Sequence, residues 1–358
     1  MRVTTAFDDL SYSYHAYGAL TQKLQHLTIN FQFDGVNYMN KFRNGFREKP
    51  LDARGMLLAL SATVALYAGT PLASASEVLV GLTVNNRLLT FDSTSPSVLL
   101  TNVAITGMQP GESLLGIDLR PTTGVLYGVG SIDRIYALNW ITGAVISSVP
   151  MFGASPNGRS FGIDFNPVSD TAGLASLRVV SDADQNLRIN VDTGEVTVDS
   201  ALIAGVPLGS VNPTIGGSAY SNNVPGAVFT TLYNIDYNFD RLVIQSPPNQ
   251  GILARVGELA PLAPRVGADL TNELVGFDIS GVSGTAFASL TGPVIPGSRL
   301  YTINLSTGGA VLVGAIGAGE SLLGLAAVSA VPEPGTFALL AIGFACLLGF
   351  ARRRSQPR

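Results

Sequence analysis

The sequence predicts an all-β fold built from repeated units, and three observations lead to this prediction. The 358 residues include 40 Gly and 20 Pro without a collagen period, which favours short strands joined by tight turns. The stretch from Val78 to Asp92 is repeated at Val125 to Asn139, an offset of 47 residues that is typical of propellers, solenoids and arrays. Hydrophobic residues make up 46% of the chain, which is ample for a packed core.

Each repeat offers four strands in the same order. The first strand contains a Gly, as in residues 114–118, 160–164 and 274–278, with a fainter copy at 219–221. The third carries an Arg, and a Thr-Gly turn often leads from it to the fourth. Four strands per unit form the blade of a β-propeller. We expect the recurrent arginines to form one structural ladder, with sugar binding as the weaker alternative; they are Arg87, Arg134, Arg188, Arg241 and Arg299.

The first unit lacks its first strand, and that strand reappears at the other end of the chain. Residues 319–326 repeat residues 111–118 almost letter for letter. The C-terminal strand should therefore complete the first blade and close the ring, which removes exposed sheet edges. We predict a five-bladed β-propeller of four-stranded blades over residues 77–329, with an open solenoid as the alternative. The segment 171–176 lengthens the first hairpin of the third blade and leaves its register open.

The N-terminal part of the chain has the features of an export signal. Residues 1–38 show no apolar period, and we interpret them as an upstream extension that translation from Met39 would omit. Residues 39–75 combine a basic region, an apolar run from Met56 and a small-residue cleavage pattern at Ala73-Ser74-Ala75, which predicts a signal peptide with a helical core. The alternative is that the apolar run forms a buried helix.

The C-terminal part has three components in a fixed order. Val331-Pro332-Glu333-Pro334 is followed by an apolar run at 337–351, which we predict to be a transmembrane helix, and then by Arg352, Arg353 and Arg354. A buried helix is the alternative. This order resembles the PEP-CTERM sorting signal of Gram-negative bacteria. The resemblance implies export through the Sec translocon, transient membrane anchoring, processing by an exosortase, and delivery to the outer surface or the extracellular matrix, commonly beside exopolysaccharide.

The body of the chain resembles domain of unknown function 4394. The resemblance covers most of residues 77–328 and is carried by residues 178–181, 185–188, 192–194, 231–236 and 247–251. It implies a propeller-like fold and no established chemistry.

The composition excludes several classes of chemistry. His15 and His26 precede the predicted signal peptide, and Cys346 lies in the C-terminal apolar run. The propeller segment therefore has neither imidazole nor thiol for a catalytic triad or a His-based metal site. Between Ser76 and Val331 there are ten Arg, no Lys and nineteen Asp or Glu, so we expect no nucleic-acid partner.

Three aspartates occupy equivalent positions in three first strands. Asp118, Asp164 and Asp278 should converge on the central channel, and Ser221 and Ala326 should fill the same place in the other two blades. Converging carboxylates can bind Ca²⁺ or raise one another's pKa. We favour the simpler interpretation that each Asp accepts hydrogen bonds from the turn that follows it, and we assign neither metal nor cofactor. The segment 182–186 lacks the Gly and Glu of a calcium loop and is interpreted as a polar hairpin turn.

These observations favour an exported, non-enzymatic propeller that acts as a surface or matrix interaction module. The alternative is a carboxylate-dependent, carbohydrate-active enzyme, a glycosidase or a lyase, that uses Asp118, Asp164 or Asp278 in the channel.

Overall fold

The computed structural model describes residues 76–205, 208, 211–259, 274–292 and 296–328, together with two short strands near the N-terminus. The latter, β1 (Gln32–Phe33) and β2 (Val36–Asn37), pair antiparallel in a sheet of their own. The predicted signal peptide (39–75), sorting motif (331–334), transmembrane helix (337–351) and terminal Arg cluster (352–354) lie outside the described residues. In the part of the chain that the structure describes, no helix is both long enough and apolar enough to span a membrane.

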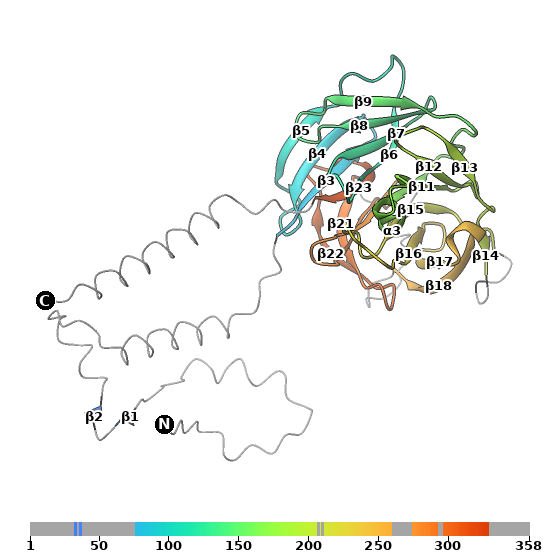
Figure 1. The fold of residues 1–358 in the computed structure, drawn as a ribbon. Helices are drawn as coiled ribbons and strands as arrows, with labels where there is room; N and C mark the ends of the chain where they lie inside the picture. The colour runs from blue at the N-terminus through green and yellow to red at the C-terminus, as the bar shows by residue number, and fades with distance from the viewer. Residues whose placement is uncertain are drawn as a thin grey trace, which may run out of the picture. The chain divides into compact units, whose positions relative to one another are not determined.

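Five sheets arranged in a ring confirm the predicted five-bladed propeller (Figure 1). Blade 1 consists of β23 (Leu322–Val328), β3 (Val78–Thr83), β4 (Arg87–Asp92) and β5 (Leu99–Ala104). Blade 2 consists of β6 (Leu114–Leu119), β7 (Leu126–Gly130), β8 (Arg134–Leu138) and β9 (Val145–Pro150). Blade 3 consists of β10 (Phe161–Phe165), β11 (Ser176–Ser181), β12 (Asn186–Asn190) and β13 (Val196–Val198).

The remaining two blades follow the same order. Blade 4 consists of β15 (Ile215–Tyr220), β16 (Leu232–Asp236), β17 (Arg241–Gln245) and β18 (Ile252–Glu258). Its outer edge carries a fifth strand, β14 (Ile203–Ala204), which pairs parallel to β18 and which the sequence did not indicate. Blade 5 consists of β19 (Val275–Ile279), β20 (Ala286–Leu290), β21 (Arg299–Ile303) and β22 (Ala310–Ala315).

Burial along each blade explains the residue patterns of its strands. The innermost strands are covered on both faces by neighbouring blades, so every residue of β10, β15 and β19 is buried and these strands are almost wholly apolar or small. The outermost strands face solvent on one side, and β5 accordingly alternates between half-buried and exposed residues. The core is therefore a set of apolar layers between the blades, such as the cluster around Phe165 and Leu177.

The ring closes where the first and last strands of the propeller meet, as predicted. β23 pairs antiparallel with β3 from Leu322↔Thr83 to Val328↔Val78, and Figure 1 shows the red β23 beside the cyan β3. Glu77 reinforces this junction, because its backbone N–H donates to Ser93 Oγ (3.0 Å) and its buried carboxylate accepts a hydrogen bond from the Ser280 hydroxyl of blade 5.

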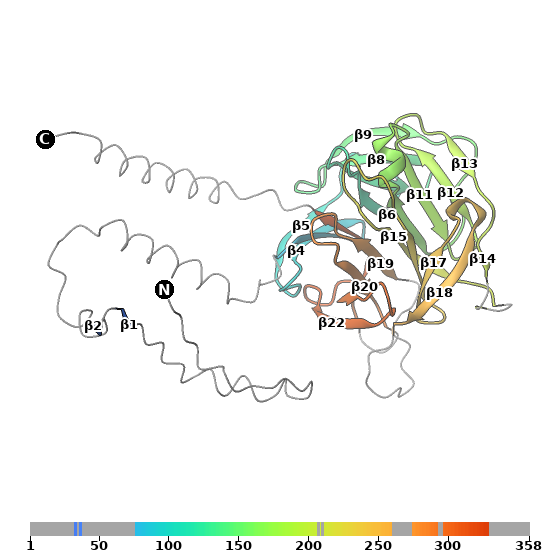
Figure 2. The same ribbon diagram turned by 60° about the horizontal axis from the view of Figure 1, so that its bottom comes forward.

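A second set of contacts joins the blades along the outside of the ring. The segment that leaves the fourth strand of one blade forms a backbone hydrogen bond with the outer part of the next blade. These bonds are Thr106 N–H to Gly143 O, Phe152 N–H to Gly194 O, Ile203 N–H to Gly251 O, Ala310 N–H to Leu259 O, and Gly317 N–H to Pro96 O. In Figure 2 the outer strands β9, β13, β14, β18 and β22 follow one another around the rim. The acceptors Gly143 and Gly194 belong to Thr-Gly turns, so these turns also join neighbouring blades.

The lengthened hairpin of blade 3 contains a short helix and not a loop of uncertain register. Helix α3 (Pro167–Thr171) begins after Asn166, whose side chain accepts hydrogen bonds from the backbone N–H groups of Val168 and Ser169. Its buried Asp170 accepts hydrogen bonds from Arg120 Nε (2.7 Å) and the Thr122 hydroxyl (2.6 Å) of blade 2. The extra residues thus connect two blades.

Truncation of the closing strand tests ring closure. A chain ending at Glu320 loses β23, which leaves β3 paired only with β4 and exposes Leu79, Val80 and Leu82, all fully buried in the ring. At roughly 1.5–3 kcal/mol per buried side chain, we expect stability to fall by about 5 kcal/mol or more. Thermal unfolding should show a melting temperature lower by at least about 10 °C. The control is a chain ending at Val328, and equal melting of the two chains would contradict closure by β23.

A pair of glycine variants tests the joints on the rim. Gly194 has φ +84° and a Cβ there would lie 2.0 Å from Pro150 O, whereas Gly124 has φ +67° and a Cβ there would meet no atom within 4 Å. Gly124→Ala should cost about 1–2 kcal/mol for its left-handed backbone alone. Gly194→Ala should cost about 1–3 kcal/mol more, because the blades must separate locally. Chemical denaturation measures both, and equal losses would show that the Gly194 turn is not a joint.

Candidate functional site

The innermost strands share a pattern that brings the five blades close together at the axis. Each contains a Gly followed two residues later by Asp or Ala; the pairs are Gly116/Asp118, Gly162/Asp164, Gly217/Ala219, Gly276/Asp278 and Gly324/Ala326. The Gly is required by space, since a Cβ at Gly162 would lie 2.7 Å from the Ser218 backbone N and one at Gly276 would lie 2.7 Å from the Gly324 carbonyl carbon. The absence of these side chains lets neighbouring inner strands approach each other.

This pattern corrects one of the predicted channel residues. Ala219 stands in β15 where Asp118, Asp164 and Asp278 stand in their strands, one residue before the strand ends. Ser221 lies one residue beyond β15, and its Oγ accepts a hydrogen bond from the Thr231 N–H (2.9 Å) in the same hairpin. The assignment of Ser221 was therefore displaced by two residues, because the blade 4 strand lacks the Asp that marks the register elsewhere. Ala326 occupies the predicted place.

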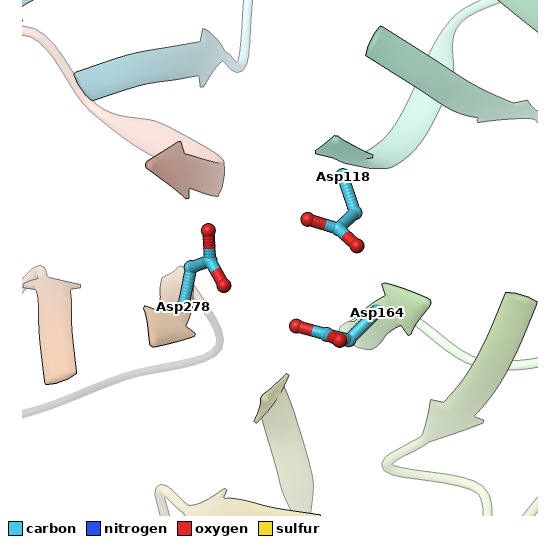
Figure 3. Close-up of side chains that lie close together, drawn as sticks. All are labelled: Asp118, Asp164 and Asp278. Carbon is cyan, nitrogen blue, oxygen red and sulfur yellow. The ribbon is translucent and has the colours of Figure 1, made fainter. Parts of the chain in front are cut away.

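The three aspartates do converge, as predicted. One carboxylate oxygen from each of Asp118, Asp164 and Asp278 lies within 4.8 Å of the others. Figure 3 shows the three side chains, which come from β6, β10 and β19, pointing toward one another. Their exposed fractions are 1%, 0% and 1%. The cluster is thus sealed inside the ring.

The hydrogen bonds of the cluster run mainly between blades. Asp118 Oδ2 accepts from the Phe165 N–H of blade 3 (2.7 Å), and Asp278 Oδ2 accepts from the Ala327 N–H of blade 1 (2.6 Å). Asp278 Oδ1 accepts from the Ile279 N–H (2.6 Å), which is still within β19. The turn after β19 is satisfied by Ser280, whose Oγ accepts from two turn amides. The expectation that these aspartates serve the turns that follow them is therefore wrong.

Asp164 differs from the other two. Neither of its oxygens has a hydrogen-bond partner of acceptable geometry among the described residues, and Asp118 Oδ1 also has none. Because buried polar groups are nearly always hydrogen-bonded, three orphan carboxylate oxygens at one point require an explanation.

The environment raises the pKa of every member of the cluster. Burial is the main cause for Asp118 and Asp164, and the neighbouring carboxylates add to it, so the pKa of each lies well above its usual value. Burial also raises the pKa of Asp278, to about 6, while the amides of Ala327 and Ile279 hold it down. The folded protein therefore favours a state in which the negative charge of the cluster is neutralised.

The axis beside the cluster is nearly filled. A cavity of about 10 Å³ remains between the inner strands; residues from all five strands line it, among them Ile117, Phe277 and Leu325, but none of the three aspartates does. This volume suits about one water molecule. The donor set of the cluster consists of carboxylate oxygens, which fit a hard cation and not a metal that prefers nitrogen or sulfur.

The recurrent arginines do not form a continuous ladder; the interactions resolved for them remain within their own blades. Arg87 donates to Asn102, Arg134 to Ser148, Arg188 to Asp199 and Arg241 to Asp236. Asp199 accepts hydrogen bonds from two arginines. Burial raises its pKa, but the hydrogen bonds and charges of Arg188 and Arg178 outweigh burial, so the pKa of Asp199 lies below its usual value.

Arg178 is the structurally central arginine that the repeat pattern missed. It is 1% exposed and donates to Asn186 (2.8 Å), Asp199 (2.6 Å) and Asn249 (2.7 Å). These partners lie in two segments that carry the family resemblance, 185–188 and 247–251, and in the connection after β13. The segments therefore meet in a buried network between blades 3 and 4. A repeat count cannot find Arg178 because its equivalents in other blades are Tyr127 and Phe287.

The segment 182–186 is a hairpin turn between β11 and β12, as predicted. Asp184 has φ +61°, and Asp182 Oδ1 accepts hydrogen bonds from the backbone N–H groups of Arg159 and Ser160. Asp182 Oδ2 accepts from the Tyr237 hydroxyl (3.2 Å), so both carboxylate oxygens of Asp182 have partners within the protein.

The closed ring and its sealed acidic axis define a small five-bladed β-propeller. The chain belongs to the family described as domain of unknown function (DUF4394), whose model matches residues 87–326. A second model, the PEP-CTERM protein-sorting motif, matches residues 330–355. This motif indicates an exosortase-processed protein that is exported and sorted at the membrane in Gram-negative bacteria.

Solved structures similar to this chain include two from other bacteria. A structural genomics protein of unknown function from Bacteroides thetaiotaomicron is 18% identical with a TM-score of 0.40; the match covers 71% of this chain and 63% of that one. The glutaminyl cyclase of Myxococcus xanthus is 10% identical with a TM-score of 0.36, over 64% of this chain and 97% of that one. A search of the curated proteins found no match.

The raised pKa values predict how stability depends on pH when a chelator is present. A carboxyl whose pKa is higher in the folded than in the unfolded state contributes stability at pH values below its unfolded pKa, and this contribution is lost as pH rises through the folded value. For Asp278 the window runs from about 3.8 to about 6. The charge of Glu77 also raises the pKa of Asp278, while Asp164 and the amides of Ala327 and Ile279 lower it.

The melting temperature in chelating buffer should therefore fall as pH rises through this window, with a loss of a few degrees or more. Asp278→Asn removes one titrating group and should flatten the fall. A melting temperature that instead increases through the window in the wild type, with the same slope in Asp278→Asn, would contradict the raised pKa values.

Proposed function

We propose that the propeller is a non-enzymatic interaction module of the cell surface or extracellular matrix, with a matrix polysaccharide as its partner. The observation that carries this proposal is the burial of Asp118, Asp164 and Asp278, which are at most 1% exposed. The acidic groups best suited to chemistry thus hold the ring together from inside, and binding is left to the outer surface.

The geometry of the cluster does not favour the glycosidase or lyase alternative. Glycosidase carboxyls flank the scissile bond at about 5–10 Å across a cleft that admits the sugar. Here the carboxylate oxygens lie within 4.8 Å of one another, and the cavity between the inner strands has only about 10 Å³ and is not lined by any of the three aspartates. A sugar ring would have to displace the inner strands to reach them.

A shallow hollow on the outer side of blades 2 and 3 offers a suitable surface for a sugar. Its volume is about 210 Å³, and its lining includes Tyr127, Ser147, Ser148 and Asp192. Hydroxyl and carboxylate groups are hydrogen-bond partners for sugar hydroxyls. Arg120 holds Asp192 at 2.8 Å, so this carboxylate is already positioned. The excess of acidic over basic residues in the propeller favours a neutral polysaccharide over an acidic one.

Binding to matrix polysaccharide from the producing bacterium tests the proposal. The exported protein should sediment with the polysaccharide, and Ser147→Trp, which fills the hollow from β9, should weaken binding at least tenfold. Thr197→Trp is the matched control, because Thr197 is an exposed residue of the outer strand β13 and is not among the residues that line the hollow; this variant should bind normally. Wild-type protein that fails to bind would contradict the proposal, and release of new reducing ends would support the enzyme alternative.

A further inference from the structure

Three carboxylates lie together at the axis without a positive charge to balance them. None of the ion pairs found among the described residues includes Asp118, Asp164 or Asp278. Buried carboxylates that stay ionised without a partner cost several kcal/mol each, so their charge must be neutralised by protons or by a cation.

Two of the three carboxylates that would bind a cation carry orphan oxygens. Both oxygens of the fully buried Asp164 and Oδ1 of Asp118 lack a hydrogen-bond partner among the described residues. Figure 3 shows these side chains aimed at a common centre with Asp278. Protons shared among three carboxyls would satisfy part of this arrangement, whereas one cation would bind an oxygen of each carboxylate at once.

The spacing agrees with coordination by a single ion. Oxygen ligands lie about 2.3–2.6 Å from Ca²⁺, so two ligands of one ion are at most about 5 Å apart. The three carboxylate oxygens lie within 4.8 Å of one another.

We propose that Asp118, Asp164 and Asp278 bind one divalent cation that prefers oxygen ligands, and that this cation is Ca²⁺. Calcium accepts irregular sets of about six to eight oxygens, including bidentate carboxylates, so three aspartates can supply up to six of its ligands. Mg²⁺ requires a near-ideal octahedron and usually keeps several waters. Zinc and related metals prefer nitrogen or sulfur ligands, which this group lacks.

The ion holds together the inner strands of three blades. Asp118 belongs to blade 2, Asp164 to blade 3 and Asp278 to blade 5, and Ala219 and Ala326 of blades 4 and 1 leave the space between them open. Coordination therefore fastens three of the five inner strands to one point. Because the ligands are sealed, the ion enters as the ring closes and leaves only when the ring opens.

Elemental analysis and thermal unfolding of the full chain test this proposal. After refolding in CaCl₂ and dialysis, the wild type should contain one equivalent of calcium per chain. It should also melt about 5 °C or more higher in CaCl₂ at roughly a hundredfold excess over Kd than in chelator. MgCl₂ at the same concentration should give a much smaller increase.

Two variants locate the site. Asp164→Asn should lose both the bound calcium and the calcium-dependent shift. Asp236→Asn is the matched control, since Asp236 is equally buried but paired with Arg241 at 2.7 Å, and it should keep both. If Asp164→Asn does not fold, Asp118→Asn provides the same comparison.

A wild type without bound metal whose melting is the same in CaCl₂ and chelator would overturn the proposal and leave shared protons as the explanation. Retention of one calcium equivalent in a folded Asp164→Asn variant would overturn the assignment of the ligands.

Discussion

The close approach of the five inner strands is the constraint on which the rest of the structure depends. A five-bladed ring leaves little room at its axis, and only Gly fits at positions such as Gly162 and Gly276, where a Cβ would meet the neighbouring strand. The same approach places the Asp two residues later in contact with the amide of the next blade. It also removes these carboxylates from solvent and raises the pKa of each. One steric requirement thus produces the tight ring, the contacts between blades and the acidic centre.

Much of the architecture could be predicted because it repeats. The offset between units, the missing first strand and its copy near Leu322 were sufficient to predict five blades and their closure by β23. The features that could not be predicted occur once: β14 on the edge of blade 4, helix α3, and the Arg178 network. Each depends on contacts between segments far apart in the chain, for which a single sequence contains no periodic signal.

Part of the site could be predicted because its aspartates recur with the repeat. The equivalence of Asp118, Asp164 and Asp278 follows from the repeat and correctly placed them together, whereas Ser221 was misassigned where blade 4 replaces the Asp with Ala219. Their partners were not foreseen, because hydrogen bonding to the next blade depends on how the blades pack. Three of the segments that carry the family resemblance likewise meet in the buried network around Arg178.

The most direct measurement of the central claim, that the axis holds a cation, is the electron density at that point in a crystal grown with calcium. The account predicts one anomalous peak between β6, β10 and β19, with an oxygen of each aspartate about 2.3–2.6 Å from it. A peak-free axis in which the three carboxyl groups hydrogen-bond directly to one another would contradict it.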